Sequence, residues 1–161
     1  MALATVEAIR DRIYTLIEAL TPTSLSGDTF RRFRNEGGAD FVEMSEKNPP
    51  GSLRRFQVRE VGDDEPPETS AITEERVRVR FQITIAYPQT ARYGGENAMD
   101  RDDVINQDWL KLNYAIGIYG RANFSSTHDC TPLGATKTRE QGQKVDFLVV
   151  DASFEYLRST T

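Results

Sequence analysis

The one histidine and the one cysteine of the chain lie two residues apart, in the segment STHDCTP. Cysteine–histidine catalysis needs a thiol and an imidazole that face each other, with a third group to orient the base. Neighbours such as His128 and Cys130, with Asp129 between them in an irregular segment, rarely reach that geometry. We therefore expect an ordinary loop or a partly buried thiol at this position. One histidine and one cysteine are also too few to build a structural zinc site of those ligands within one subunit.

Three carboxylates, Asp100, Asp102 and Asp103, form a second group with possible chemistry. A calcium-binding EF-hand loop that began at Asp100 would need glycine at its sixth position and glutamate at its twelfth. The chain has Ile105 and Lys111 there, so the pattern does not match. Capping of a following helix already accounts for the carboxylates. A looser divalent-ion site at this cluster stays open.

Glycine pairs and nucleophile motifs give no sign of a further active site. The pairs Gly37-Gly38 and Gly94-Gly95 lack the spacing of loops that hold phosphate groups. The chain has neither a G-x-S-x-G elbow nor an HExxH motif. The sequence therefore predicts a protein that is not an enzyme and that has no cofactor and no defined metal site.

Arginine is the residue type whose spacing stands out, in a chain with a formal net charge of −5. Arginines gather in the first half, at Arg31, Arg32, Arg34, Arg54, Arg55, Arg59, Arg76, Arg78 and Arg80. Residues 60–68 are acidic and contain no basic residue. Three interpretations remain open: a solvated surface balanced by nearby acids, charge complementarity with another copy or a partner, and contact with DNA phosphates. A pI near 5.0 and few interleaved aromatic residues weigh against the last.

The elements that must position these arginines follow from hydrophobic periodicity. Alternation predicts strands at 53–61 and 75–87, with arginine on the polar side of each. If the two strands pair antiparallel, their arginines form one basic surface. A three- and four-residue apolar repeat predicts helices at 6–20, capped by Thr5, and at 101–119, ending at Gly120.

The remainder of the chain is expected to hold one more strand and several loops. A strand is predicted at 145–157, where a phase change near Val149-Val150 indicates a bulge or burial of both faces. Mobile loops are expected near 35–52, 62–70, 88–98 and 121–144, the last with a short extended piece near 134–140. The expected fold is α+β, a single domain over 1–161 with one mostly antiparallel sheet packed against two amphipathic helices.

The composition indicates the cellular compartment in which the protein is expected to function. One cysteine allows no intrachain disulfide, which is typical of a reducing compartment. No apolar stretch has the length of a membrane helix, and charges such as Glu7 and Arg10 interrupt the N-terminal apolar pattern. We therefore expect no membrane partner and no secretory signal.

The order of elements resembles a known family. The segments that carry this resemblance are TVEAIRDRIYTLIEAL, LRRFQVREV, RVRVRFQITIAYP, RDDVINQDWLKLNYAI and VDFLVVDASFEYL. With a strand that ends in a YP turn and a second helix that begins at an acidic D-D-V, they resemble the tail terminator (tail completion) proteins of long-tailed bacteriophages. The resemblance spans nearly the whole chain and includes no catalytic signature.

The resemblance implies a structural virion protein that forms a ring, expected to be a hexamer, at the head-proximal end of the tail. Such a ring is assembled in the host cytoplasm, caps the tail tube, stops tail polymerisation and joins the tail to the head. Its implied partners are other copies of the chain, the tail tube protein and the neck connector protein, with DNA present only by passage through the ring lumen. The candidate interface residues in this chain are Arg55, Arg59, Arg76, Arg78, Arg80, Asp63, Asp64 and Glu65.

Three other interpretations of the sequence remain. The first is a head-completion or neck connector protein of the same particle, which shares the small ring-forming architecture. The second is a nucleic-acid-binding protein that uses the arginine surface. The third is an enzyme whose site carries no recognisable motif.

Overall fold

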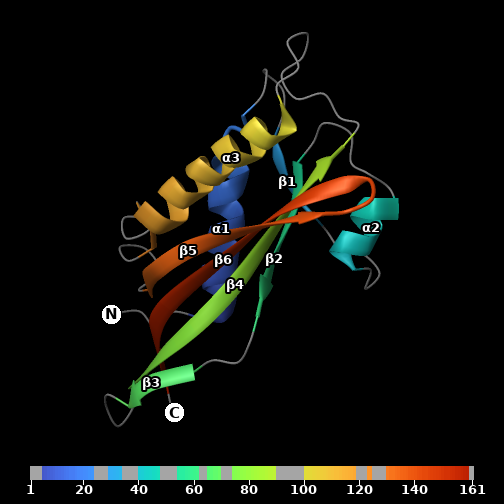
Figure 1. Ribbon diagram of the computed structural model, residues 1–161. Coiled ribbons are helices and arrows are strands. Elements are labelled where there is room, and N and C mark those ends of the chain that lie inside the picture. The colour runs from blue at the N-terminus through green and yellow to red at the C-terminus, as the bar shows by residue number, and fades with distance from the viewer. Residues whose placement is uncertain are drawn as a thin grey trace.

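Six strands of one sheet organise the computed structural model shown in Figure 1. The structure describes residues 5–23, 29–33, 40–47, 54–61, 65–69, 74–89, 100–118, 123–124 and 130–159. The strands are β1 (Phe30–Arg32), β2 (Arg54–Glu60), β3 (Glu65–Thr69), β4 (Glu74–Pro88), β5 (Cys130–Gln141) and β6 (Val145–Ser159). Along the sheet their order is β1-β2-β4-β6-β5, and β3 pairs with β4 beside this path.

The predicted antiparallel pairing of β2 and β4 is confirmed, with Val58 opposite Ile83. The pairs β3–β4, β4–β6 and β5–β6 are also antiparallel. Strand β1 is the exception, because it runs parallel to β2. The sheet is therefore mixed, and with the helices it gives the expected α+β class.

Helix α1 (Val6–Ala19) begins where the sequence predicts. The Thr5 side chain accepts a hydrogen bond from the Ala8 N–H, as an N-cap does. Helix α3 (Arg101–Leu112) begins after Asp100, whose carboxylate accepts from the Asp102 N–H. It continues into a short π-helix, η1 (Asn113–Ile118). Both predicted helix starts are confirmed.

One face of the sheet, here called the inner face, packs against α1 and α3 (Figure 1). It carries the alternating apolar residues of β4, which are fully or almost fully buried: Val77, Val79, Phe81, Ile83 and Ile85. They form one core with Ile9, Ile13 and Ile17 of α1 and Val104 and Ile105 of α3. Burial of this core supplies the main favourable free energy of folding.

The opposite, outer face is covered by a third helix at one end. Helix α2 (Phe41–Lys47) places Phe41 on a second core with Ala86, Val145, Phe147 and Val149. In Figure 1, α2 and β3 lie at opposite ends of the long strand β4. Residues 145–150 of β6 are consequently buried on both faces. This confirms the expected double burial, while the alternative of a bulge is wrong, since β6 keeps an unbroken register with β4.

Several segments expected to be loops form regular structure. Helix α2 lies within 35–52, β3 within 62–70, and β5 replaces most of the irregular 121–144 region. The side chains of β5 are mostly exposed, so the strand lacks the apolar alternation by which a sequence reveals a strand. Strand β3 contains Pro66 and Pro67, which is compatible with an edge position. The expected loop at 88–98 lies almost wholly outside the described residues.

Candidate interaction surface

The polar residues of β2 and β4 share the outer face of the sheet. Arg55 and Arg59 on β2, and Arg78 and Arg80 on β4, all have partly or fully exposed side chains. The register places Arg59 opposite Gln82, and the Arg59 Nη2 donates to Gln82 Oε1 at 3.2 Å. The structure thus brings four predicted interface residues onto one surface. The fifth, Arg76, lies in β4, where its backbone pairs with both β3 and β6.

The neighbouring strand β6 brings carboxylates to the same face. Glu155 lies opposite Arg78, and their side chains approach to 3.8 Å between Arg78 Nε and Glu155 Oε2. Asp151 lies opposite Gln82, beside the arginines. The Arg78 side chain is 57% exposed, so this ion pair adds little stability. The outer face therefore changes from basic on β2 and β4 to acidic at Asp151 and Glu155 of β6.

The acidic segment after β2 is only partly described. Asp63 and Asp64 lie outside the described residues. Glu65 belongs to β3, where it lies opposite Arg78, and Glu68 lies opposite Arg76. Part of the predicted acidic partner thus lies beside the arginine strand of its own chain.

A shallow groove of about 920 Å³ runs over the outer face between β4 and β5. Its lining residues include Arg78, Arg80, Asp151, Ser153, Leu133 and Thr136. Leu133, which is 47% exposed, adds an apolar side chain to this lining. The groove therefore combines basic, acidic and apolar groups.

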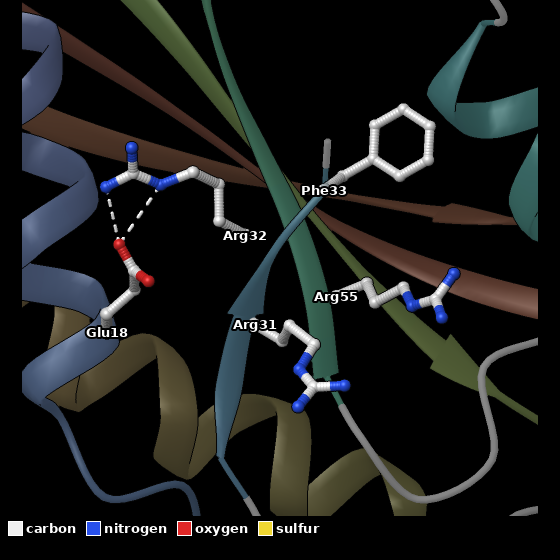
Figure 2. Close-up of a pocket in the computed structure, with 5 residues that line it drawn as sticks. All are labelled: Glu18, Arg31, Arg32, Phe33 and Arg55. Carbon is white, nitrogen blue, oxygen red and sulfur yellow. Dashed lines mark hydrogen bonds and ion pairs between the residues drawn. The ribbon is translucent and has the colours of Figure 1, made fainter. Parts of the chain in front are cut away.

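The edge strand β1 extends the basic surface to a pocket of about 480 Å³ (Figure 2). Arg31 lies directly opposite Arg55 in the parallel register of β1 and β2. On the other side of β1, Arg32 makes an ion pair with Glu18 of α1 at 2.5 Å. Arg31 was part of the arginine cluster noted in the sequence, but it was not among the predicted interface residues. No local pattern reveals this position, because the parallel pairing of β1 with β2 joins segments that are distant in the sequence.

A buried charge network on the inner face was missed by the sequence analysis. Arg54 and Asp108 are both fully buried, and Arg54 Nε lies 2.8 Å from Asp108 Oδ2. The same carboxylate accepts from the Tyr87 hydroxyl at 2.8 Å and from the Thr23 N–H at 2.7 Å. Arg54 Nη2 also donates to the Thr23 carbonyl at 2.5 Å. The network ties β2, β4 and α3 to Thr23 in the segment that follows α1.

A second ion cluster lies where α3 begins beside β5 and β6. Arg101 Nε lies 2.7 Å from Asp146 Oδ2, and Arg139 Nη2 lies 3.1 Å from the same oxygen. Burial by itself would raise the pKa of the Asp146 carboxyl, but hydrogen bonds from Gln89, Arg101 and Arg139 and the charge of Arg101 outweigh it. The pKa of Asp146 therefore lies below its ordinary value. The pKa of Arg139 is raised: burial opposes the charged form, and the bonds to Asp102 and Asp146 prevail.

The other residues with possible chemistry are only partly described. Cys130 is buried at the start of β5, whereas His128 and Asp129 lie outside the described residues. Asp102 is engaged with Arg139 as an ion pair. Within the part of the chain that is described, no group of three or more His, Cys, Asp or Glu side chains is placed to hold a metal ion. Nor does that part contain a helix long and apolar enough to span a membrane.

Comparison with known proteins does not assign the chain to a family: no protein-family model matches it, and no curated protein matches it significantly.

Proposed function

We propose that the protein is a structural subunit that assembles with copies of itself into a ring, and that this ring is the tail terminator of a long-tailed bacteriophage. The observation that carries the assembly proposal is the outer sheet face, on which Arg59, Arg78 and Arg80 lie exposed toward the end of the sheet remote from α2, with Arg55 farther along the same face. The resemblance in element order gives the more specific identity. The α+β fold with two long antiparallel strands agrees with that order.

A ring needs two different and complementary patches on each subunit, because its contacts run head to tail. The arginines of the outer face supply a basic patch, and arginine suits it since its planar fork pairs bidentately with carboxylates. The acidic segment that contains Asp63, Asp64 and Glu65 is the proposed complement. A chain with a net charge of −5 can carry both patches without being basic overall.

In this proposal the ring caps the last ring of tail tube protein and presents its other side to the neck connector protein. Its place in the virion is the head-proximal end of the tail, and DNA only passes through its lumen. The same ring architecture would serve a neck connector of the particle. The number of subunits separates these two functions, with six for the terminator and twelve for the connector.

Light scattering behind size exclusion, over a range of protein concentrations, tests the proposal. The subunit mass is 18.2 kDa, so a closed hexamer has a mass of about 109 kDa. A species of that mass with a central hole in electron micrographs is the expected result. A species near twelve subunits would contradict the terminator in favour of the connector. A monomer, both alone and in the presence of tail tubes, would contradict the ring.

Charge reversal tests the surface itself. The double variant Arg78→Glu/Arg80→Glu is expected to remain folded by circular dichroism and to lose assembly, because like charges would then face each other. The double variant Lys47→Glu/Lys144→Glu, which makes the same change of charge at exposed positions near α2, is the control and should assemble normally. Normal assembly of the arginine variant would contradict the assigned surface.

The arginine surface also favours a second candidate, binding to nucleic acid. Contacts with phosphates release counterions, so the affinity would fall steeply as the salt concentration rises. Saturable, salt-sensitive binding to DNA by a protein that stays monomeric would support this candidate over the ring.

A further inference from the structure

The pocket at the β1–β2 edge contains three guanidinium groups and one carboxylate, from Arg31, Arg32, Arg55 and Glu18 (Figure 2). Two of these groups neutralise each other. Arg32 donates from Nε at 3.1 Å and from Nη2 at 2.5 Å to the same oxygen of Glu18. The Arg32 guanidinium also lies over the Tyr14 ring, 4.2 Å from its centroid. Arg32 and Glu18 therefore form a fixed, neutral wall of the pocket.

The other two arginines are neighbours, and the described part of the chain gives them no counter-charge. Arg31 and Arg55 are opposite residues of adjacent strands, so their side chains leave the sheet side by side on the outer face. Like charges directly opposite each other in a sheet are destabilising. Among the residues that the structure describes, no carboxylate forms an ion pair with either of them. The pocket thus has a net charge of about +2, the charge of these two guanidinium groups.

We propose that this pocket binds a phosphate dianion, either free phosphate or the terminal phosphate of a monoester. Two guanidinium forks on neighbouring strands can together bond three oxygens, and a phosphate monoester offers three acceptor oxygens and a charge near −2 at neutral pH. A carboxylate or a phosphodiester carries only one negative charge. The charge match therefore favours the dianion over an acidic side chain or the DNA backbone. This inference does not depend on the ring.

Isothermal titration calorimetry at constant ionic strength tests the proposal with four probes: inorganic phosphate, a nucleoside monophosphate, acetate, and a dinucleoside monophosphate that has a diester but no terminal phosphate. We expect saturable binding of inorganic phosphate, of the nucleoside monophosphate, or of both. Acetate and the diester should bind much more weakly or not at all. A preference for inorganic phosphate identifies the free ion as the ligand, and a preference for the monophosphate identifies a monoester. Lack of saturable binding to both, or equal binding of acetate or the diester, would overturn the proposal.

Substitutions of the lining residues test whether phosphate binds in this pocket. Arg31→Gln and Arg55→Gln should each weaken phosphate binding about tenfold or more, since each removes charge-assisted hydrogen bonds. Lys144→Gln removes one exposed charge elsewhere and should leave the affinity unchanged. Glu18→Gln removes the only negative charge among the described residues that line the pocket, and it should tighten binding. Equal losses in Arg55→Gln and Lys144→Gln, or weaker binding in Glu18→Gln, would overturn the assignment to this pocket.

Discussion

Arg54 and Arg55 are consecutive residues of one strand, yet they occupy opposite environments. Arg54 is fully buried on the inner face and bound to Asp108, whereas Arg55 points to the outer face and lines the pocket of Figure 2. A buried charge is tolerated only when it is paired and hydrogen-bonded, while an exposed charge is solvated and free to meet a partner. Strand parity thus decides whether an arginine of this chain supports the fold or is available for binding.

The sharpest test of this contrast, and the largest expected effect, is Arg54→Ala. It leaves the Asp108 carboxylate buried without its charge partner, so the free energy of unfolding should fall by about 3–5 kcal/mol. Arg55→Ala is the matched control and should change it by no more than about 0.5 kcal/mol. Urea denaturation followed by circular dichroism measures both. Similar losses in the two variants would contradict the contrast.

A double variant tests whether the instability of Arg54→Ala comes from the unpaired buried charge of Asp108. Arg54→Met/Asp108→Leu replaces both charges with apolar side chains, and such replacements of buried pairs are often close to neutral. The double variant should therefore be more stable than Arg54→Ala, despite its two changes. The loss of the hydrogen bond from the Tyr87 hydroxyl to Asp108 would limit the recovery.

The next largest effect is expected for Asp146→Asn. This buried carboxylate accepts bonds from Arg101 and Arg139, and its loss should cost about 1–3 kcal/mol at neutral pH. Because the folded-state pKa of Asp146 is lower than its ordinary value of 3.8, its contribution is present above that pH and is lost as the pH falls through the folded-state pKa. Urea titrations from pH 7 to pH 2 should show the two proteins converging at acid pH. A constant difference would show that the charge of Asp146 is not the cause.

A smaller effect is expected for Arg32→Ala, at the partly exposed edge of the sheet. The variant loses the contact with the Tyr14 ring and the ion pair with Glu18, which together are worth about 1 kcal/mol at such a site. Glu18→Ala keeps the contact with the Tyr14 ring and should cost less. Thermal unfolding at low and high salt would separate the two parts, because salt weakens the exposed ion pair more.

The smallest expected change is an increase in stability for Arg31→Ala. Removal of one of two like charges that lie opposite each other should raise the free energy of unfolding by about 0.2–0.5 kcal/mol. Saturating phosphate should abolish this gain, since the bound anion relieves the same repulsion. A loss of stability in Arg31→Ala without ligand would contradict the unneutralised pair.

Periodicity was a sound guide where one face of an element is buried and the other is not. It correctly predicted α1, β2, β4 and the starts of both long helices from apolar spacing and caps. Of β5, an edge strand whose order depends on backbone pairing with β6, only a short extended piece near 134–140 was predicted. Helix α2, whose contact with the outer face is made largely by Phe41, was missed. Both depend on partners distant in the sequence, which local patterns cannot reveal.

The candidate surface was predictable in part for the same reason. Alternation placed the outer-face arginines together, but it could not show that the parallel strand β1 would set Arg31 beside Arg55. Arg54 could have been recognised, because it has the parity of Phe56 and Val58. Asp108 likewise lies four residues from both Val104 and Leu112, on the buried side of α3. A charge within an apolar repeat is a signal of a buried pair.

The uninterrupted pairing of β4 with β6 has a mechanical consequence. Each strand has 15 residues, so the two form a ribbon about 50 Å long. A force applied along this ribbon, from its opposite ends, would shear all of its cross-strand hydrogen bonds at once, whereas a force at one end across the strands would open them one after another. The subunit should therefore withstand far greater tension along the strands than across them.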